Sequence, residues 1–237
     1  MGRRTILVTG VSRGIGAAIA ARCSVDGYEV VGLSRTKPDD FDGIHHAVDL
    51  GEKDAKAALA DIAQRHAPCR LVANAGIVTP GPVETAEDDD FERTMRINVQ
   101  SILWAVQAML PAMRSERFGR IVTLGSRAAL GKRERAIYSA SKAAVVGLTR
   151  TLALELAAHE VTVNCVAPGP IETEMFKIDQ PVGSEKRERL MAGVPLGRVG
   201  STDDIAHSVS HFLADEAGYV TGQVLHVCGG LSVGGSA

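Results

Sequence analysis

The sequence predicts an α/β protein built on a doubly wound, Rossmann-type parallel sheet of about seven strands with helices on both faces. Short apolar runs alternate with longer segments of helical period, as is typical of parallel strands joined by helical crossovers. Right-handed crossovers place helices on both faces of such a sheet. At 237 residues, and with no linker to divide the chain, we expect one domain over residues 1–237.

The elements follow from this alternation in chain order. The expected strands are Thr5–Thr9, Glu29–Leu33, His45–Val48, Arg70–Ala73, Gly119–Leu124, Thr162–Ala167 and Gln223–Val227. The expected helices are Ile15–Asp26, Lys53–Arg65, Phe91–Met113, Ala136–Leu156 and Asp203–Leu213. Residues 170–200 break the rhythm with prolines, glycines and dense charge. Because so long an insertion is usually functional, we expect a loop with short helices that covers the substrate.

The overall charge and the cysteines exclude several classes of partner. The 26 basic and 28 acidic side chains nearly cancel, which gives no reason to expect nucleic acid or a membrane surface. The four cysteines are scattered without metal-ligand spacing, so we expect no metal site. The first apolar run ends at Thr9 and is too short for a signal sequence, which favours a cytoplasmic protein.

A glycine-rich turn follows the first predicted strand. Glycines there let the backbone approach a pyrophosphate, and the next helix offers free N–H groups and its positive end. A purely structural turn is the alternative, but the strand before it and the helix after it favour a dinucleotide site. The predicted contacts are Gly10, Ser12, Arg13, Gly14, Ile15 and Gly16.

The end of the second strand indicates which dinucleotide binds. An acidic residue there would accept hydrogen bonds from a ribose and repel a 2′-phosphate, yet Ser34 and Arg35 occupy the position. Arg13 is a second cation that could bind the phosphate through two hydrogen bonds. The alternative is that both arginines are solvated surface residues. We expect NADP(H) to be preferred, with NAD(H) possible.

Three side chains could carry out carbonyl chemistry. Ser126 follows the fifth predicted strand, and Tyr138 and Lys142 share one face of the next helix. A carbonyl that receives hydride needs a hydrogen-bond donor and a proton source. Ser126 would polarise the carbonyl, Tyr138 would give the proton, and the Lys142 ammonium would stabilise the phenolate. Each residue alone could be structural, but their combination behind a nucleotide turn favours catalysis.

The Gly-x-x-x-Gly-x-Gly turn, Ser126 and Tyr138-x-x-x-Lys142 together resemble the short-chain dehydrogenase/reductase family, and the resemblance extends over nearly the whole chain. It implies that Asn98 is a fourth catalytic member, which holds a water linking the lysine to solvent. Ala73 replaces the first Asn of the family's Asn-Asn-Ala-Gly motif. Further cofactor contacts implied by the resemblance are Asp49, Leu50, Asn74, Ala75, Gly76, Tyr138, Lys142, Pro168, Gly169, Ile171 and Thr173.

Residues 194–198 and 219–223 resemble the bacterial 3-oxoacyl-acyl-carrier-protein reductases. This implies reduction of a 3-oxoacyl thioester or related ketone, carried on acyl carrier protein or coenzyme A. Of the two basic positions with which such reductases dock the carrier, Arg117 stands at one and His159 replaces the other. Relatives commonly form homotetramers through the two long helices and the C-terminal region, so a homotetramer is expected.

Some features leave the substrate open. The interval from Ser126 to Tyr138 is one residue shorter than is usual in the family, and Lys-Arg-Glu-Arg occurs at 132–135 and again at 186–189. These repeats could attract an anionic substrate, although their glutamates favour a solvated surface of mixed charge. The alternatives are an alcohol, sugar or polyol dehydrogenase of the same family, a non-catalytic nucleotide sensor, and a structural oligomerisation module.

Overall fold

The computed structural model describes residues 4–233, so both ends of the predicted 1–237 domain lie outside the described part. Its seven strands form one parallel sheet in the order β3-β2-β1-β4-β5-β6-β7. The strands are β1 (Thr5–Thr9), β2 (Glu29–Ser34), β3 (Ile44–Ala47), β4 (Arg70–Ala73), β5 (Gly119–Leu124), β6 (Val161–Pro168) and β7 (Val224–Val227). The order reverses between β1 and β4, where doubly wound sheets bind ligands beyond the carboxyl ends of the strands.

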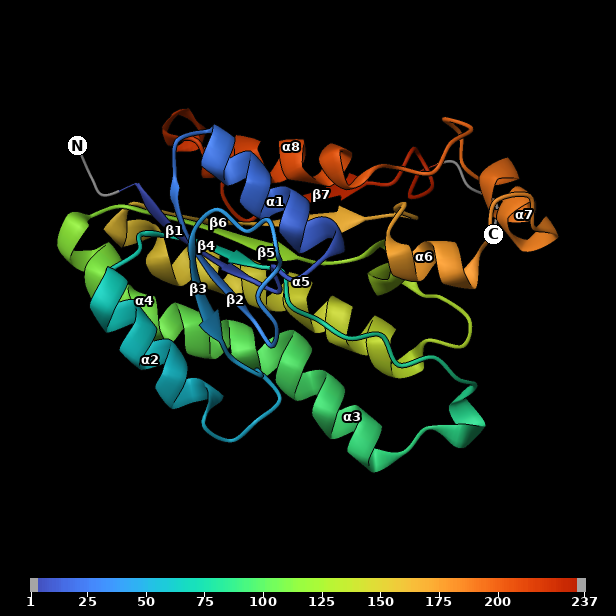
Figure 1. Cartoon of the computed structure of the whole chain (residues 1–237), viewed down its shortest axis with the longest axis horizontal. Coiled ribbons are helices and arrows are strands. Elements are labelled where there is room, and N and C mark those ends of the chain that lie inside the picture. Colours follow the sequence, from blue (N-terminus) through green and yellow to red (C-terminus); the bar gives the residue numbers. More distant parts are fainter. Residues whose placement is uncertain (1–3, 234–237) are drawn as a thin grey trace.

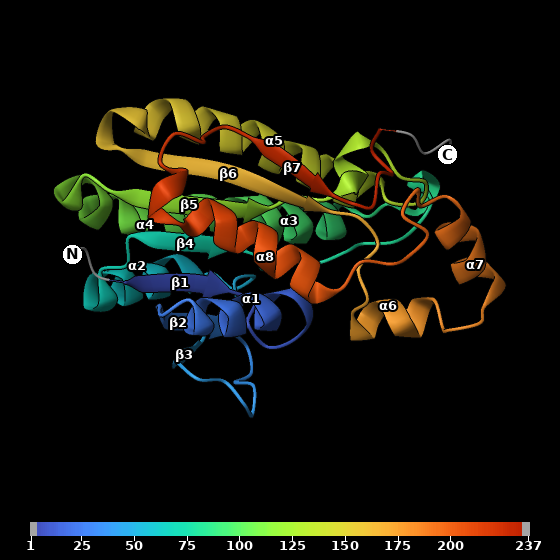
Figure 2. The same cartoon turned by 90° about the horizontal axis from the view of Figure 1, so that it is seen from above.

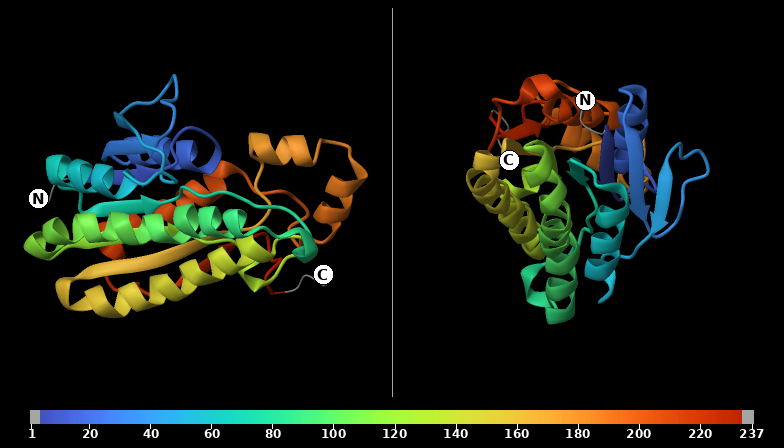
Figure 3. Two further views of the ribbon diagram at one scale, coloured as in Figure 1. Left: turned by 90° about the horizontal axis from the view of Figure 1, so that it is seen from below. Right: turned by 90° about the vertical axis from the view of Figure 1, so that its left-hand side faces the viewer.

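Helices cover both faces of this sheet, which confirms the predicted fold class. Figure 1 shows α1 and α8 on one face and α2, α4 and α5 on the other, and Figure 3 shows the second group from below. The helices are α1 (Gly14–Val25), α2 (Ala55–His66), α3 (Asp88–Met95), α4 (Ser101–Glu116), α5 (Ala136–Leu156), α6 (Glu174–Asp179), α7 (Glu185–Ala192) and α8 (Thr202–Leu213). None of the helices in the described residues is long and apolar enough to cross a bilayer.

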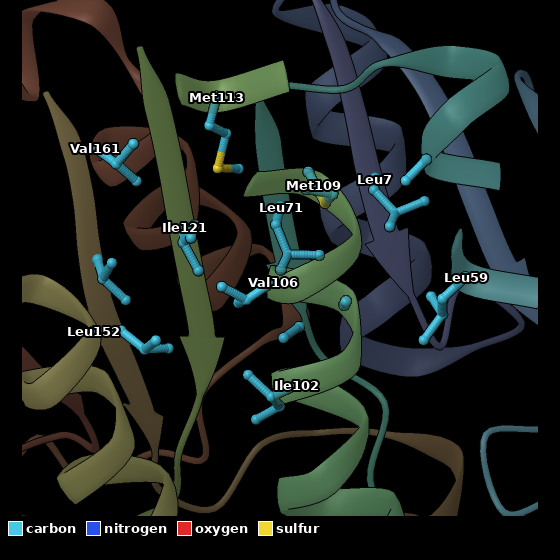
Figure 4. Packing of buried hydrophobic residues seen from close by; sticks show 14 of the residues in the cluster. Leu7, Leu59, Leu71, Ile102, Val106, Met109, Met113, Ile121, Leu152 and Val161 are labelled. Atoms are coloured by element: carbon cyan, nitrogen blue, oxygen red, sulfur yellow. The ribbon is translucent and has the colours of Figure 1, made fainter. Parts of the chain in front are cut away.

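Each face of the sheet has its own apolar core. Alternate side chains of a strand point to opposite faces, so Leu7 joins the core beneath α2 and α4 whereas its neighbours Ile6 and Val8 join the core beneath α1 and α8. Figure 4 shows Met109 and Met113 of α4 beside the strand residues of the first core. Burying one such side chain stabilises the fold by about 1.5–3 kcal/mol, and the two cores hold the strand ends rigidly.

The predicted helix Phe91–Met113 is wrong in one respect. The structure has α3 and α4 separated by a π-helical turn, η2 (Arg96–Gln100), and the combined segment begins three residues earlier and ends three later. Hydrophobic period does not reveal a π turn, because the extra residue shifts the pattern only locally. The turn buries Asn98. The other predicted strands and helices differ from the observed ones by at most two residues at either end.

Residues 170–200, here named the covering segment, leave the sheet after β6 and return at α8. Two hydrogen bonds close their base, from Glu172 N to Gly200 O (2.8 Å) and from Gly200 N to Pro170 O (3.0 Å). Figure 2 shows their helices α6 and α7 beyond the carboxyl ends of the strands. Arg187 of α7 binds Glu172 (2.6 Å) and lies over the Phe176 ring, which ties the two helices together.

Candidate active site

Tyr138 and Lys142 lie one turn apart near the start of α5. Lys142 is 5% exposed, and its Nζ donates a hydrogen bond to the Leu124 carbonyl at the end of β5 (2.7 Å). The same Nζ is 5.7 Å from the centre of the Tyr138 ring. The Tyr138 hydroxyl hydrogen bonds to no described residue, so it is available to a ligand. The structure therefore places a buried ammonium directly behind a free phenol.

The Lys142 ammonium has no carboxylate partner within the described residues. Burying an unpaired ammonium costs several kcal/mol even after the protein relaxes, and one carbonyl offsets only part of that cost. An anion that forms transiently beside it would be stabilised by the same field. The Tyr138 side chain, whose ring centre is 5.7 Å from this ammonium, forms such an anion when its hydroxyl loses a proton.

Asn98 links the π turn to this helix. Its Oδ1 accepts from the Ile77 N–H (2.8 Å), and its Nδ2 donates to the Ile77 carbonyl (3.0 Å) and to Ser141 Oγ (2.9 Å). Ser141 donates in turn to the Tyr138 carbonyl (2.7 Å). Sequence reasoning missed Ser141, although it stands three residues after Tyr138, on the same side of the helix. Asn98 thereby holds the first turn of α5 against the loop after β4.

Ser126 follows β5 and begins the short turn η3 (Arg127–Leu130). Its Oγ accepts a hydrogen bond from the Ala128 N–H (3.1 Å), which fixes the side chain. No described residue accepts its hydroxyl proton, so that proton can be donated to a ligand oxygen. Cys165 lies behind this strand end on β6, and burial raises the pKa of its thiol, which keeps it neutral and inert.

The glycine turn leaves no room for side chains. A Cβ on Gly16 would lie 2.0 Å from the Gly10 carbonyl oxygen, and Gly10 has a φ of 76°. The Asn74 amide spans the turn by donating to the carbonyls of Thr9 (2.9 Å) and Gly10 (3.2 Å). No side chain caps the N-terminus of α1. A bare backbone cradle at an open helix N-terminus fits the pyrophosphate of a dinucleotide.

The segment after β6 comes close to this cradle. Thr173 Cγ2 lies 3.4 Å from the place where a Cβ on Gly14 would be, and Gly169 packs against Cys228 with no space for a side chain. Ile171 is buried. Gly76, at the end of the loop from β4, lies against Asn98 and Lys142. These contacts bring the predicted cofactor residues of three distant segments to one crevice.

The residues predicted to contact the adenosine end differ in whether their side chains are free to bind a ligand. Ser34 is buried, and its hydroxyl donates to the Thr36 carbonyl (2.8 Å) and lies 2.9 Å from His45 Nε2, so it is occupied within the fold. The Leu50 side chain is likewise part of the core. Arg35 is 68% exposed with its Nη1 4.0 Å from Asp49 Oδ2. Arg13 is exposed and has no ion-pair partner among the described residues.

Comparison with known proteins agrees with this geometry. A family model described as enoyl-(acyl carrier protein) reductase matches residues 10–232. The 3-oxoacyl-(acyl-carrier-protein) reductase of Aggregatibacter actinomycetemcomitans is 35% identical over 243 residues, which cover 96% of this chain and 98% of that protein. The chain belongs to the short-chain dehydrogenase/reductase family.

Solved structures of the short-chain dehydrogenase/reductase family superpose closely. A protein of Agrobacterium tumefaciens inferred to be a 2-deoxy-D-gluconate 3-dehydrogenase, solved with bound NADP, has a TM-score of 0.89 at 30% identity and covers 97% of this chain, with 96% of its own length matched. The aldohexose dehydrogenase of Thermoplasma acidophilum has a TM-score of 0.89 at 30% identity, with 98% of this chain and 95% of that one covered.

The predicted carrier-docking position has a local partner in this short-chain dehydrogenase/reductase. Arg117 donates two hydrogen bonds to Glu160 Oε1, of 3.1 and 2.8 Å, and Glu160 directly follows His159. Both members of the pair are exposed and stand before β5 and β6, at the end of the sheet opposite Tyr138. The arginine at this predicted docking position thus has an acidic partner within the chain, in an exposed pair of the kind that contributes about 0–1 kcal/mol.

The loop between Ser126 and Tyr138 is held by the loop after β4. Gly81 N donates to the Glu134 carbonyl (3.0 Å), and Gly81 and Arg135 form an isolated parallel bridge. Glu134 adopts a φ of 57°, which turns the chain sharply before α5. In this member of the short-chain dehydrogenase/reductase family, the shortened loop is therefore anchored just before Tyr138.

Proposed function

We propose that this oxidoreductase reduces a carbonyl to an alcohol with NADP(H), with Tyr138 as the proton donor. The observation that carries the proposal is the buried, carboxylate-free ammonium of Lys142 beside the unoccupied hydroxyl of Tyr138. In water-excluded surroundings such a charge favours the phenolate strongly. A tyrosine paired with this lysine can give a proton and later regain it.

Each side chain of the site has its own role in the proposed reduction. The cofactor, when bound, supplies a hydride to the carbonyl carbon. Ser126 donates a hydrogen bond to the carbonyl oxygen, and Tyr138 transfers its proton to that oxygen as negative charge develops there. Lys142 stabilises the resulting phenolate. Asn98 holds Ile77 and, through Ser141, the first turn of α5, so that these groups keep their places.

Residues on both sides of the crevice would hold the cofactor. The backbone of the glycine turn would bind the pyrophosphate, Arg13 and Arg35 the 2′-phosphate, and Ile171 and Thr173 the carboxamide end. The preference for NADP(H) is supported by the two exposed cations and by the NADP bound to the Agrobacterium relative. The remaining predicted contacts are Asp49, Asn74, Ala75, Gly76, Pro168 and Gly169; for Ser34 and Leu50 only the backbone is free to take part.

The substrate we favour is a 3-oxoacyl thioester or related ketone, since curated relatives over the whole chain are 3-oxoacyl-(acyl-carrier-protein) reductases. The test is an NADPH-oxidation screen with acetoacetyl thioesters, small diketones and keto sugars, repeated with NADH. We expect turnover with at least one class, a higher kcat/KM with NADPH, and a loss of about a thousandfold or more in Tyr138→Phe and Ser126→Ala at unchanged NADPH affinity. Near-normal turnover in Tyr138→Phe would overturn the mechanism.

The sugar dehydrogenases among the structural neighbours favour a second candidate, oxidation of a sugar or sugar acid. Initial rates with NADP⁺ and a panel of aldoses and aldonic acids would discriminate these two functions, because a reductase of acyl thioesters is not expected to oxidise a sugar. Binding of NADPH without turnover in either direction would instead indicate a nucleotide sensor.

We infer that the enzyme is a single-domain cytoplasmic protein that forms a homotetramer. Leu154 on the outer face of α5 is 82% exposed and Tyr219 is fully exposed, which suits surfaces that a second copy would cover. Light scattering after size-exclusion chromatography tests this: a mass of one chain would contradict it. Leu154→Glu should then reduce the assembled mass.

A further inference from the structure

The loop before Tyr138 carries an excess of unpaired positive charge. Arg127 and Lys132 form no ion pair or hydrogen bond with any described residue. Arg135 donates only to the neighbouring Glu134 carbonyl (2.7 Å). By contrast, Arg189 on α7 has a carboxylate partner, Glu185. These three are cations without counter-charges at the entrance to the crevice.

The covering segment faces this loop with a pair of opposite charges, Asp179 and Lys186. The field at Lys132 comes from Arg135 and Arg127 on its own loop and from Asp179 and Lys186 on the covering segment, so the two segments face each other. The pKa of Lys132 is lowered mainly by partial desolvation and secondly by the guanidinium of Arg135. The Lys132 side chain nevertheless retains contact with solvent. Asp179 is already paired with Lys186 (2.7 Å) and so offers little to the others.

The fold keeps this loop in place. Arg135 is bridged to Gly81, and α5 begins at the next residue. Figure 1 shows the yellow-green loop that precedes α5 at the same end of the molecule as α6, and Figure 3 shows the same grouping from below. Assembling like charges without a counter-ion is unfavourable in the free protein and becomes favourable when an anion enters.

Two of the three cations adjoin the proposed catalytic residues along the chain. Arg135 stands three residues before Tyr138, and Arg127 directly follows Ser126, so both flank the reacting centre. Nearby exposed apolar side chains, Leu130 on the loop with Met175 and Ile178 on α6, suit the uncharged part of a chain.

We propose that Arg127, Lys132 and Arg135 form an anion-binding rim that selects carbonyl substrates carrying a carboxylate or phosphate away from the reacting carbon. The inference rests on the proposed function, because it takes Tyr138 as the reacting centre. Guanidinium and ammonium groups bind both kinds of anion. The rim lies at the end of the sheet opposite Arg117, so it is separate from the carrier-docking position.

Matched pairs of compounds test the rim. Levulinate and its methyl ester differ in one carboxylate charge, and dihydroxyacetone phosphate and dihydroxyacetone differ in the phosphate. Acetoacetyl-CoA and the acetoacetyl thioester of N-acetylcysteamine differ in the outer part of the pantetheine arm and in the nucleotide with its phosphates. We expect kcat/KM with NADPH to be at least about tenfold higher for the charged member of one pair. The pair with the largest ratio identifies the source of the anion.

One double variant and two controls decide the assignment. Arg127→Ala combined with Lys132→Ala should remove most of that ratio and lower kcat/KM for the neutral member less than about threefold. Lys56→Ala on α2 and Arg189→Ala on α7 each remove one exposed cation away from the loop and should leave the ratio unchanged. Equal losses for both members of every pair, or a ratio near one in the unaltered enzyme, would overturn the rim.

A binding measurement separates the rim from the proposed chemistry. Tyr138→Phe loaded with NADPH is titrated calorimetrically with levulinate, dihydroxyacetone phosphate and acetoacetyl-CoA, so no turnover is needed. The rim predicts binding of one anion that weakens about tenfold or more when Arg127 and Lys132 are also replaced. If the unaltered enzyme reduces no ketone yet the titration shows this loss, the proposed function fails and the rim stands. If ketones are reduced but no anion binds in this way, the rim fails alone.

Discussion

Asn98 Nδ2 and Ser141 Oγ are 2.9 Å apart, and their hydrogen bond connects the π turn to the first turn of α5. Asn98→Leu removes this bond and both bonds to Ile77 while nearly preserving the volume. We expect it to lower the free energy of unfolding by about 2–4 kcal/mol and to reduce kcat more than it raises the KM for NADPH. Urea unfolding and steady-state kinetics measure these effects. Ser141→Ala, which loses only one partner of Asn98, should cost about 1 kcal/mol.

Gly16 and Gly147 form a matched pair of helical glycines. A Cβ on Gly16 would collide with the Gly10 carbonyl oxygen at 2.0 Å, whereas one on Gly147 meets nothing within 4 Å. Gly16→Ala should destabilise the protein by about 1–3 kcal/mol and weaken NADPH binding. Gly147→Ala should stabilise it by about 0.5–1 kcal/mol, because alanine favours the helix. Thermal unfolding and NADPH fluorescence titration give both values, and equal effects of the two changes would contradict this account.

The Arg187–Glu172 pair ties α7 to the base of the covering segment, and its side chains are 12% and 26% exposed. Glu172→Gln removes the charge on one side of a partly buried pair. We expect amide hydrogen exchange within residues 174–192 to become about tenfold faster or more, since charged hydrogen bonds contribute about 1.5–3 kcal/mol. Glu185→Gln on the fully exposed pair with Arg189 is the control and should change exchange little. Unchanged exchange in Glu172→Gln would show that the pair does not hold the segment.

Asp204 is the third residue of α8 and completes a capping box with Ser201. Its carboxylate accepts hydrogen bonds from the Ser201 N–H (2.7 Å) and from both terminal nitrogens of Arg198 (2.7 and 3.1 Å). The hydrogen bonds from Arg198, followed by that from Ser201, hold the pKa of Asp204 well below its usual range. The unfolded chain therefore binds this proton first as the pH falls, so the stabilisation is complete above about pH 5 and declines progressively below about pH 4, toward the lowered pKa of the folded state. Unfolding of Asp204→Asn followed against pH should show a deficit at pH 7 that narrows in acid. A deficit independent of pH would argue against the ionic contribution.

The sequence was most informative where one residue type serves one local purpose. The glycines of the first turn, the strands with their apolar runs and the Tyr138–Lys142 spacing are each readable from neighbours along the chain, and the handedness of crossovers predicts helices on both faces of the sheet. The π turn at Asn98 was not readable, because one inserted residue leaves the average helical period nearly unchanged.

Side-chain partners that only the tertiary fold brings together could not be predicted from the sequence either. Ser34 occupies the predicted adenosine position, yet its hydroxyl is occupied by Thr36 and His45, which lie on the turn after it and on the next strand. Arg117 stands at a predicted docking position but pairs with Glu160, brought close by the alignment of β5 and β6. Such partners become visible only when the strands have been placed side by side.

The bridge between Gly81 and Arg135 has a bearing on how this protein can be redesigned. It fastens two loops from different crossovers, so neither wall of the crevice can be lengthened or shortened without displacing the other. We expect libraries that vary residues 78–86 and 127–135 together to yield altered selectivity more often than libraries that vary either loop alone. The two stretches thus form one evolutionary unit, although the 40 residues from 87 to 126 separate them in the chain.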